Sequence, residues 1–183
     1  MHILLTRHIL DSKDLIQKFK SNGFKVSNLP LLDISRLDYN ELKFNKYSAI
    51  IFTSSNAIRY LDLRNVDKNI LCFCVGSSTE KTARSNGFQN VFAADGNVRN
   101  LLELVQQNLS VKDEKILYVS GEVVSYPLDK ELISVGYNVE RLINYTAKHN
   151  QNLDLSFLES LKKDMPNLVY VYSENSAKSF LNL

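Results

Sequence analysis

The chain has 183 residues, of which 44% are hydrophobic and 23% charged, a composition typical of a globular protein with one large or two small domains. Its 22 basic and 20 acidic residues give a net charge of +2, so the sequence offers no broad basic field for nucleic acid. Its apolar runs are too short to predict a signal peptide or a membrane-spanning segment. We therefore expect a cytoplasmic protein that contacts neither nucleic acid nor membrane.

Short apolar runs alternate with amphipathic stretches from one end of the chain to the other. The predicted strands cover residues 3–6, 25–29, 49–53, 71–75, 91–93, 116–119, 139–143 and 168–172. Helices are predicted between them, most clearly over 97–109, where apolar residues recur at helical spacing and Asn97 can cap the first turn. Pro127 favours a further helix start. This alternation predicts an α/β fold with parallel sheets covered by helices, flavodoxin-like or Rossmann-like.

Three predicted helices end with the same pattern of serine, any residue, glycine and an aromatic residue, followed by a strand. The glycines of "KSNGFKV" (20–26), "RSNGFQNV" (84–91) and "ISVGYNV" (133–139) can adopt the left-handed conformation that ends a helix. The pattern indicates a repeated helix-to-strand turn. It therefore describes architecture and not chemistry.

Polar residues gather where strands give way to helices, in "TSSN" (53–56), "GSST" (76–79), "SGEVVS" (120–125) and "SENS" (173–176). Such turns lie at the carboxyl ends of the strands, where open α/β sheets bind ligands. Their hydroxyls and the free N–H groups of a helix start suit an anion, but serine, threonine and asparagine are also ordinary helix caps. Each turn alone is explained by capping, whereas four together favour a cleft that binds carboxylates or phosphates.

Several familiar sites have no counterpart in the sequence. Neither GxGxxG nor GxxxxGK[ST] nor GxSxG occurs, which excludes dinucleotide, P-loop and hydrolase motifs. The histidines are scattered, and Cys72 and Cys74 are interpreted as small core residues and not as metal ligands. The residues alone thus predict an anion-binding α/β protein without metal or nucleotide.

The ordered set of turns resembles the uroporphyrinogen-III synthase family. The resemblance is carried by "ILLTR" (3–7), "IIFTSSNAI" (50–58), "CVGSSTEKTARSNGF" (74–88), "DGNVRNLLELV" (95–105), "ILYVSGEVVSYPLDKELISVGYNVERLINYTA" (116–147) and "VYVYSENSAKSFLNL" (169–183). It implies two α/β domains joined by two crossing strands, at 29–37 and 142–150. The first domain would be discontinuous, comprising 1–34 and 148–183, and the second would comprise 35–147.

The resemblance also implies an activity. The family closes hydroxymethylbilane to uroporphyrinogen III, with loss of water and inversion of the terminal pyrrole ring, as a carbon–oxygen lyase of haem biosynthesis without a cofactor. Its substrate, a linear tetrapyrrole, carries eight carboxylates, in agreement with the polar turns. The full-length enzyme is expected to be a monomer.

The site residues carried over by the resemblance lie in the polar turns and in the second crossing strand. Tyr145 matches the cleft tyrosine of the family, either as proton donor to the departing hydroxyl or as a packing aromatic. Thr79 matches a cleft threonine, or else caps its helix. The substrate-binding candidates are Ser54, Asn56, Ser77, Ser78, Thr79, Gly121, Glu122, Ser173, Asn175 and Ser176.

One departure concerns the turn after Gly121-Glu122. Many relatives carry a basic residue there, whereas Val123, Val124 and Ser125 are neutral in this chain.

A second departure concerns the end of the sequence. Aligning 173–176 with 54–57 predicts that the discontinuous domain lacks two strand–helix units and that these residues are a partial chain. We then expect low stability, or pairing through an uncovered sheet edge.

Two other functions remain compatible with the residues. One is a non-catalytic two-domain binder of an anionic small molecule. The other is a sugar-phosphate isomerase with Glu122 as its base.

Overall fold

The computed structural model describes residues 1–95, 98–110 and 114–183, and the predicted cap Asn97 lies outside them. The chain divides into two compact units, which we call unit 1 (residues 1–34 and 147–183) and unit 2 (residues 35–146). The chain passes between the units twice, within the strands β3 and β8. No helix in the described part of the chain is long and apolar enough to cross a membrane.

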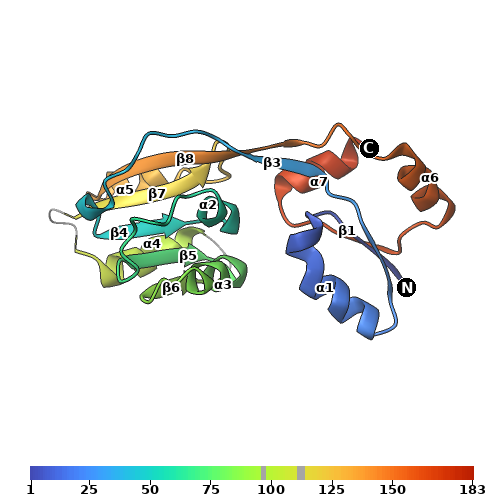
Figure 1. Cartoon of the computed structure of the whole chain (residues 1–183), viewed down its shortest axis with the longest axis horizontal. Helices are drawn as coiled ribbons and strands as arrows, with labels where there is room; N and C mark the ends of the chain where they lie inside the picture. Colours follow the sequence, from blue (N-terminus) through green and yellow to red (C-terminus); the bar gives the residue numbers. More distant parts are fainter. Residues whose placement is uncertain (96–97, 111–113) are drawn as a thin grey trace. The chain divides into compact units, whose positions relative to one another are not determined.

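The elements alternate between strand and helix in both units (Figure 1). Those of unit 1 are β1 (His2–Leu5), α1 (Ile9–Ser21), β2 (Lys25–Asn28), α6 (Leu155–Lys163), β9 (Leu168–Tyr170) and α7 (Glu174–Leu181). Those of unit 2 are η1 (Phe44–Lys46), β4 (Ala49–Phe52), α2 (Ser55–Arg59), β5 (Leu71–Val75), α3 (Ser77–Ser85), β6 (Val91–Ala94), α4 (Val98–Asn108), β7 (Lys115–Gly121) and α5 (Leu128–Ser134). The two strands with residues in both units are β3 (Leu32–Arg36) and β8 (Asn138–His149).

Unit 2 is a sheet covered by helices on both faces. Its strands lie in the order β3-β8-β7-β4-β5-β6, and β8, β7, β4, β5 and β6 run parallel (Figure 1). One face, with Phe52 and Val119, packs against Ala57 of α2 and Ala83 of α3. Alternate residues on the same strands, such as Tyr118, point to the opposite face, which packs on α4 and α5. These layers confirm the predicted fold class.

Unit 1 has a smaller sheet in the order β2-β1-β9, with all strands parallel. Its buried cluster is formed by Leu4, Leu29, Leu31 and Leu161. The edge strand β9 leaves Leu168 and Tyr170 each 43% exposed. Unit 1 therefore buries less apolar surface than unit 2, whose sheet is covered on both faces.

The repeated glycine pattern has the predicted geometry. Gly23, Gly87 and Gly136 have φ values of 78°, 93° and 99°, in the left-handed region that favours glycine. Each follows a helix and leads into β2, β6 or β8. The prediction of a common helix-to-strand turn is thus confirmed.

Most strand ends lie within two residues of the prediction, and two differences bear on the site. The predicted strands 139–143 and 142–150 form one strand, β8. Polar residues alternate along it, so the sequence shows no continuous apolar run there. β7 continues past the predicted end at Val119 to Gly121, because β8 remains beside it and pairs with it up to Tyr145 across a bulge.

Candidate functional site

Three of the polar turns meet at one edge of the sheet in unit 2. The turns 53–56 and 76–79 follow β4 and β5, and residues 120–122 are the end of β7 and the residue after it; the three strands are neighbours and run parallel. Parallel strands place their carboxyl ends at the same edge, so these turns lie in a row. Eight of the predicted site residues therefore belong to this edge of unit 2 or to β8: Ser54, Asn56, Ser77, Ser78, Thr79, Gly121, Glu122 and Tyr145.

The first turn is a helix cap. Ser54 is the N-cap of α2, and its hydroxyl accepts a hydrogen bond from the Asn56 amide at 3.3 Å. The Asn56 side chain accepts a further hydrogen bond from Arg59 at 3.2 Å. The polar residues that end this strand thus start the next helix, as the capping explanation predicts.

The second turn starts α3 differently from the prediction for Thr79. Gly76, with a φ of 77°, is the N-cap, so of the two alternatives for Thr79 the one in which it caps the helix is wrong. Thr79 is the third residue of α3 and is 4% exposed, while Ser77 and Ser78 are not buried. α3 therefore starts without a side-chain cap, and the hydroxyls of this turn are not used for capping.

Tyr145 lies directly over the end of β7. A Cβ atom at Gly121 would lie 2.7 Å from Tyr145 Cζ and 3.0 Å from its hydroxyl oxygen. The ring also stacks on Tyr60, with centroids 6.3 Å apart and planes at 30°. Gly121 therefore gives Tyr145 the space for its position, and the phenol is half-buried beside the third turn.

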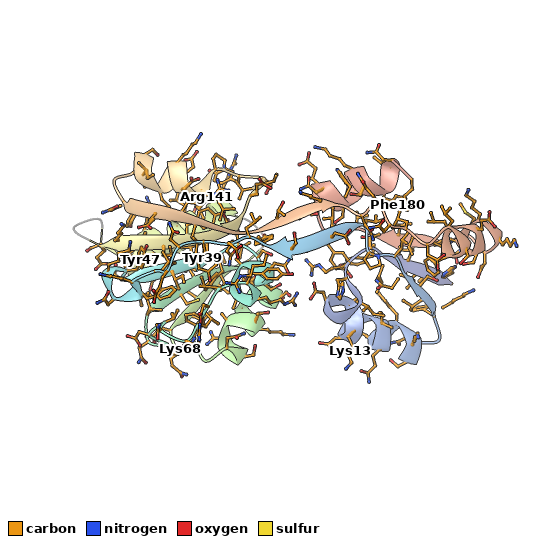
Figure 2. The ribbon with its side chains drawn as sticks, turned by 45° about the horizontal axis from the view of Figure 1, so that its top comes forward. Lys13, Tyr39, Tyr47, Lys68, Arg141 and Phe180 are labelled. Atoms are coloured by element: carbon orange, nitrogen blue, oxygen red, sulfur yellow. The ribbon has the colours of Figure 1, made fainter. Side chains whose placement is uncertain are left out.

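The third turn is tied to β8 by hydrogen bonds. The Glu122 amide donates to the Tyr145 carbonyl at 2.9 Å, and Thr146 Oγ1 donates to the Glu122 carboxylate at 2.7 Å. From β8 the Arg141 guanidinium, labelled in Figure 2, donates to the Ser120 hydroxyl and to the carbonyls of Gly121 and Glu122. The backbone of this turn is therefore fixed.

A buried phenol lies beside the first turn. Tyr118 is 1% exposed, and its hydroxyl is 3.3 Å from the Thr53 hydroxyl. Burial raises the pKa of the Tyr118 phenol. Tyr118 therefore remains neutral at physiological pH and hydrogen-bonds within the sheet edge.

The remaining predicted residues belong to unit 1. Ser173 is the N-cap of α7, and its hydroxyl accepts from the Ser176 amide at 3.2 Å and lies 3.0 Å from the Ser176 hydroxyl. Ser176 is 5% exposed, and Asn175, in the first turn of the helix, is half-buried. Ser54 and Ser173 thus have the same local role, one in each unit.

Sequence reasoning missed three polar residues of β8, namely Arg141, Asn144 and Thr146. Asn144 is fully buried, and its amide donates to the Ala57 carbonyl of α2 at 2.8 Å. These residues occur in "ERLINYTA", but their contacts depend on the register of β8 against β7, which the sequence does not give.

The described residues contain no group of three His, Cys, Asp or Glu side chains that could hold a metal ion. Cys72 and Cys74 are fully buried thiols, with sulfur atoms 3.8 Å apart, in the core beneath α2 and α3. Their interpretation as core residues is confirmed.

A family model described as "Uroporphyrinogen-III synthase HemD" matches residues 13–183. The chain belongs to this family. The resemblance predicted from the ordered turns is thereby confirmed.

Two solved structures that are similar to this chain show the same fold. The uroporphyrinogen-III synthetase of Helicobacter pylori 26695 matches with a TM-score of 0.64 and 21% identity, covering 99% of this chain and 77% of that chain. A mutant uroporphyrinogen III synthase of the extremely thermophilic bacterium Thermus thermophilus matches with a TM-score of 0.59 and 13% identity, covering 100% of this chain and 76% of that chain.

A curated relative in sequence is an uncharacterized protein of Rickettsia prowazekii (strain Madrid E). It is 27% identical over an alignment of 143 residues, which covers 76% of this chain and 50% of the relative. The chain therefore spans about half the length of the curated relative that it matches.

Proposed function

We propose that this chain is a uroporphyrinogen-III synthase that closes hydroxymethylbilane to uroporphyrinogen III and releases water. The single observation that carries the proposal is family membership over residues 13–183. The three neighbouring polar turns of unit 2 support it, because helix starts and backbone amides suit a substrate with many carboxylates. Membership does not favour an anion binder without catalysis or a sugar-phosphate isomerase.

In the proposed reaction Tyr145 assists the departure of the hydroxyl group. Its phenol donates a proton to the hydroxymethyl oxygen, so the carbon–oxygen bond breaks and water leaves. The already substituted α-carbon of the terminal pyrrole then attacks the resulting azafulvene cation. The bond from that carbon to its existing methylene bridge breaks, and the freed methylene bonds to the unsubstituted α-carbon of the same ring. That carbon loses its proton, which restores the phenol and leaves the terminal ring inverted. This sequence is a lyase reaction that balances without a cofactor.

The substrate carboxylates are assigned to the turns. In unit 2 they would contact Ser54, Asn56, Ser77, Ser78, Thr79 and the backbone of the turn at Gly121 and Glu122, and in unit 1 Ser173, Asn175 and Ser176. Holding a flexible bilane in a folded conformation contributes to catalysis by itself, because it decides which carbon attacks. The amides can hold carboxylates without a net basic surface.

The test is the ratio of type III to type I uroporphyrin formed from fresh hydroxymethylbilane, which closes to type I without enzyme. We expect an excess of type III. In Tyr145→Phe, which keeps the stack on Tyr60, we expect the rate to fall by roughly 10²-fold or more while KM changes little.

Tyr60→Phe is the matched control, since it alters a neighbouring phenol but leaves Tyr145 intact. Type I alone from the unaltered chain would contradict the proposed activity. A Tyr145→Phe variant as fast as the unaltered chain would instead contradict only the proton-donor role.

A further inference from the structure

The turn after β7 carries no basic residue of its own. Val123, Val124 and Ser125 are neutral, although the proposed substrate is rich in carboxylates. The guanidinium of Arg141 nevertheless lies at this turn, since it reaches from the neighbouring strand β8. The contacts of Arg141 therefore determine which groups of the turn can bind a ligand.

Arg141 contacts three successive residues. Its Nε donates to Ser120 Oγ at 2.8 Å, and its Nη2 donates to the carbonyls of Gly121 at 2.9 Å and Glu122 at 3.1 Å. Ser120 is 1% exposed, so the hydroxyl that Arg141 binds is buried. The planar fork of the guanidinium allows one side chain to span these acceptors.

These contacts orient the peptide groups of the turn. A trans peptide directs its C=O and N–H groups in opposite directions. Because the Gly121 carbonyl is bound by Arg141, the Glu122 N–H points away from the guanidinium, and it donates to the Tyr145 carbonyl. The Glu122 carbonyl and the Val123 N–H belong to the next peptide group. Because Arg141 binds this carbonyl, the Val123 N–H also points away from Arg141.

The internal repeat provides an independent observation. Leu5 of β1 pairs with Asn28 of β2 and with Tyr170 of β9. Tyr118 of β7 pairs in the same way with Arg141 of β8 and with Ile51 of β4. Alignment of Ser173 with Ser54 places Tyr170 opposite Ile51, so Asn28 and Arg141 occupy equivalent positions.

Asn28 and Arg141 both donate hydrogen bonds to backbone carbonyls of the neighbouring strand and its turn. The Asn28 amide donates to the carbonyls of Leu5 at 3.1 Å and Arg7 at 2.8 Å, which belong to the end of β1 and the turn after it. Each unit therefore uses a side chain of the neighbouring strand to fix the turn at the end of its paired strand. In unit 2 this side chain is also a cation.

We propose that Arg141 is a positioning residue that holds the Gly121–Val123 backbone ready to bind a carboxylate of the substrate. It acts through the turn, by fixing the Val123 N–H as a donor, and its charge adds to the favourable potential there. This inference rests on the proposed function. It identifies a residue of the reaction that the polar turns alone did not reveal.

The test compares Arg141→Lys and Arg141→Met with the unaltered chain. Lysine keeps the charge but lacks the planar fork, and methionine lacks both. We therefore expect both variants to raise KM roughly tenfold while kcat stays within about twofold. The amide cross-peaks of Glu122 and Val123 should shift in both variants. Arg84→Met is the matched control. Arg84 also donates a hydrogen bond to a backbone carbonyl, that of Val91 at 2.9 Å, but this arginine lies on α3 and not on β8.

Two results would overturn the proposal. One is an unchanged KM and unchanged cross-peaks in Arg141→Met. The other is recovery of the original KM in Arg141→Lys, which would show that charge acts without positioning.

Failure of the proposed function gives a different pattern. If the unaltered chain forms no type III product, binding of uroporphyrin III, which is also an octacarboxylate, replaces KM as the readout. Weaker binding to Arg141→Met, by roughly tenfold, then supports the positioning role. Equal binding, or no binding to the unaltered chain, overturns it.

Discussion

At the scale of single residues, the contact between Tyr145 and Gly121 links sequence to chemistry most directly. The glycine is not needed for a left-handed backbone, since its φ is not among the positive values of the chain. It is needed because any Cβ would lie 2.7 Å from the Tyr145 ring. A small residue at the end of a strand thus determines where the phenol lies.

We expect Gly121→Ala to destabilise unit 2 by roughly 1–3 kcal/mol, because the added methyl forces the Tyr145 ring from its place. Urea unfolding measures the loss. In a Tyr145→Ala background the methyl meets no ring, so the same change should cost much less. Equal losses in both backgrounds would show that the ring contact is not the cause.

At the scale of elements, a cluster of charges at the opposite edge of the sheet joins η1, β7 and β8. The Glu140 carboxylate lies 2.6 Å from Lys115 Nζ and 3.0 Å from Lys46 Nζ, and both ammonium groups lie near the Tyr47 ring. Hydrogen bonds, first from Lys115 and then from Lys46, lower the pKa of Glu140 from 4.5 to about 2. The ionised carboxylate therefore stabilises the folded state.

Because the pKa of Glu140 is lower when folded, its contribution is present above pH 4.5 and is lost as the pH falls towards 2. Glu140→Gln should cost about 0.5–1 kcal/mol at pH 7, a small value because the side chain is partly exposed. The difference from the unaltered chain should shrink at pH 3. Chemical denaturation at both pH values measures it, and a constant difference would exclude this ionisation as the cause.

At the scale of the whole molecule, the two units differ in the cores that hold their sheets. The central strands β1 and β4 are both fully buried, but β1 belongs to the smaller sheet of unit 1. Beside β1, the edge strand β9 leaves Leu168 and Tyr170 partly exposed, whereas β4 lies between β7 and β5. Local stability follows buried apolar contacts, so unit 1 should open first.

Native-state hydrogen exchange tests this difference. Amides of β1 should exchange faster than those of β4, by roughly tenfold or more for a difference of about 1.4 kcal/mol in opening free energy. The comparison uses two central strands, so edge effects are matched. Equal protection of both strands would show that the two units open together.

The sequence by itself determined the alternation of strands and helices, the glycine turns and the family. These features depend on local rules, namely apolar periodicity, the left-handed conformation of glycine, and polar residues before helices. The sequence also located the polar turns at Ser54, Gly121 and Ser173. The roles predicted for these residues in binding remain predictions.

Only the tertiary structure decided which distant residues meet. The N-cap of α3 is Gly76 and not Thr79, and two predicted strands form the single strand β8. The pairing of β8 with β7 brings Arg141 and Thr146 to the turn after β7 and places Tyr145 over Gly121. Strand register depends on packing between segments far apart in the chain, so no local pattern around Arg141 could reveal its contacts.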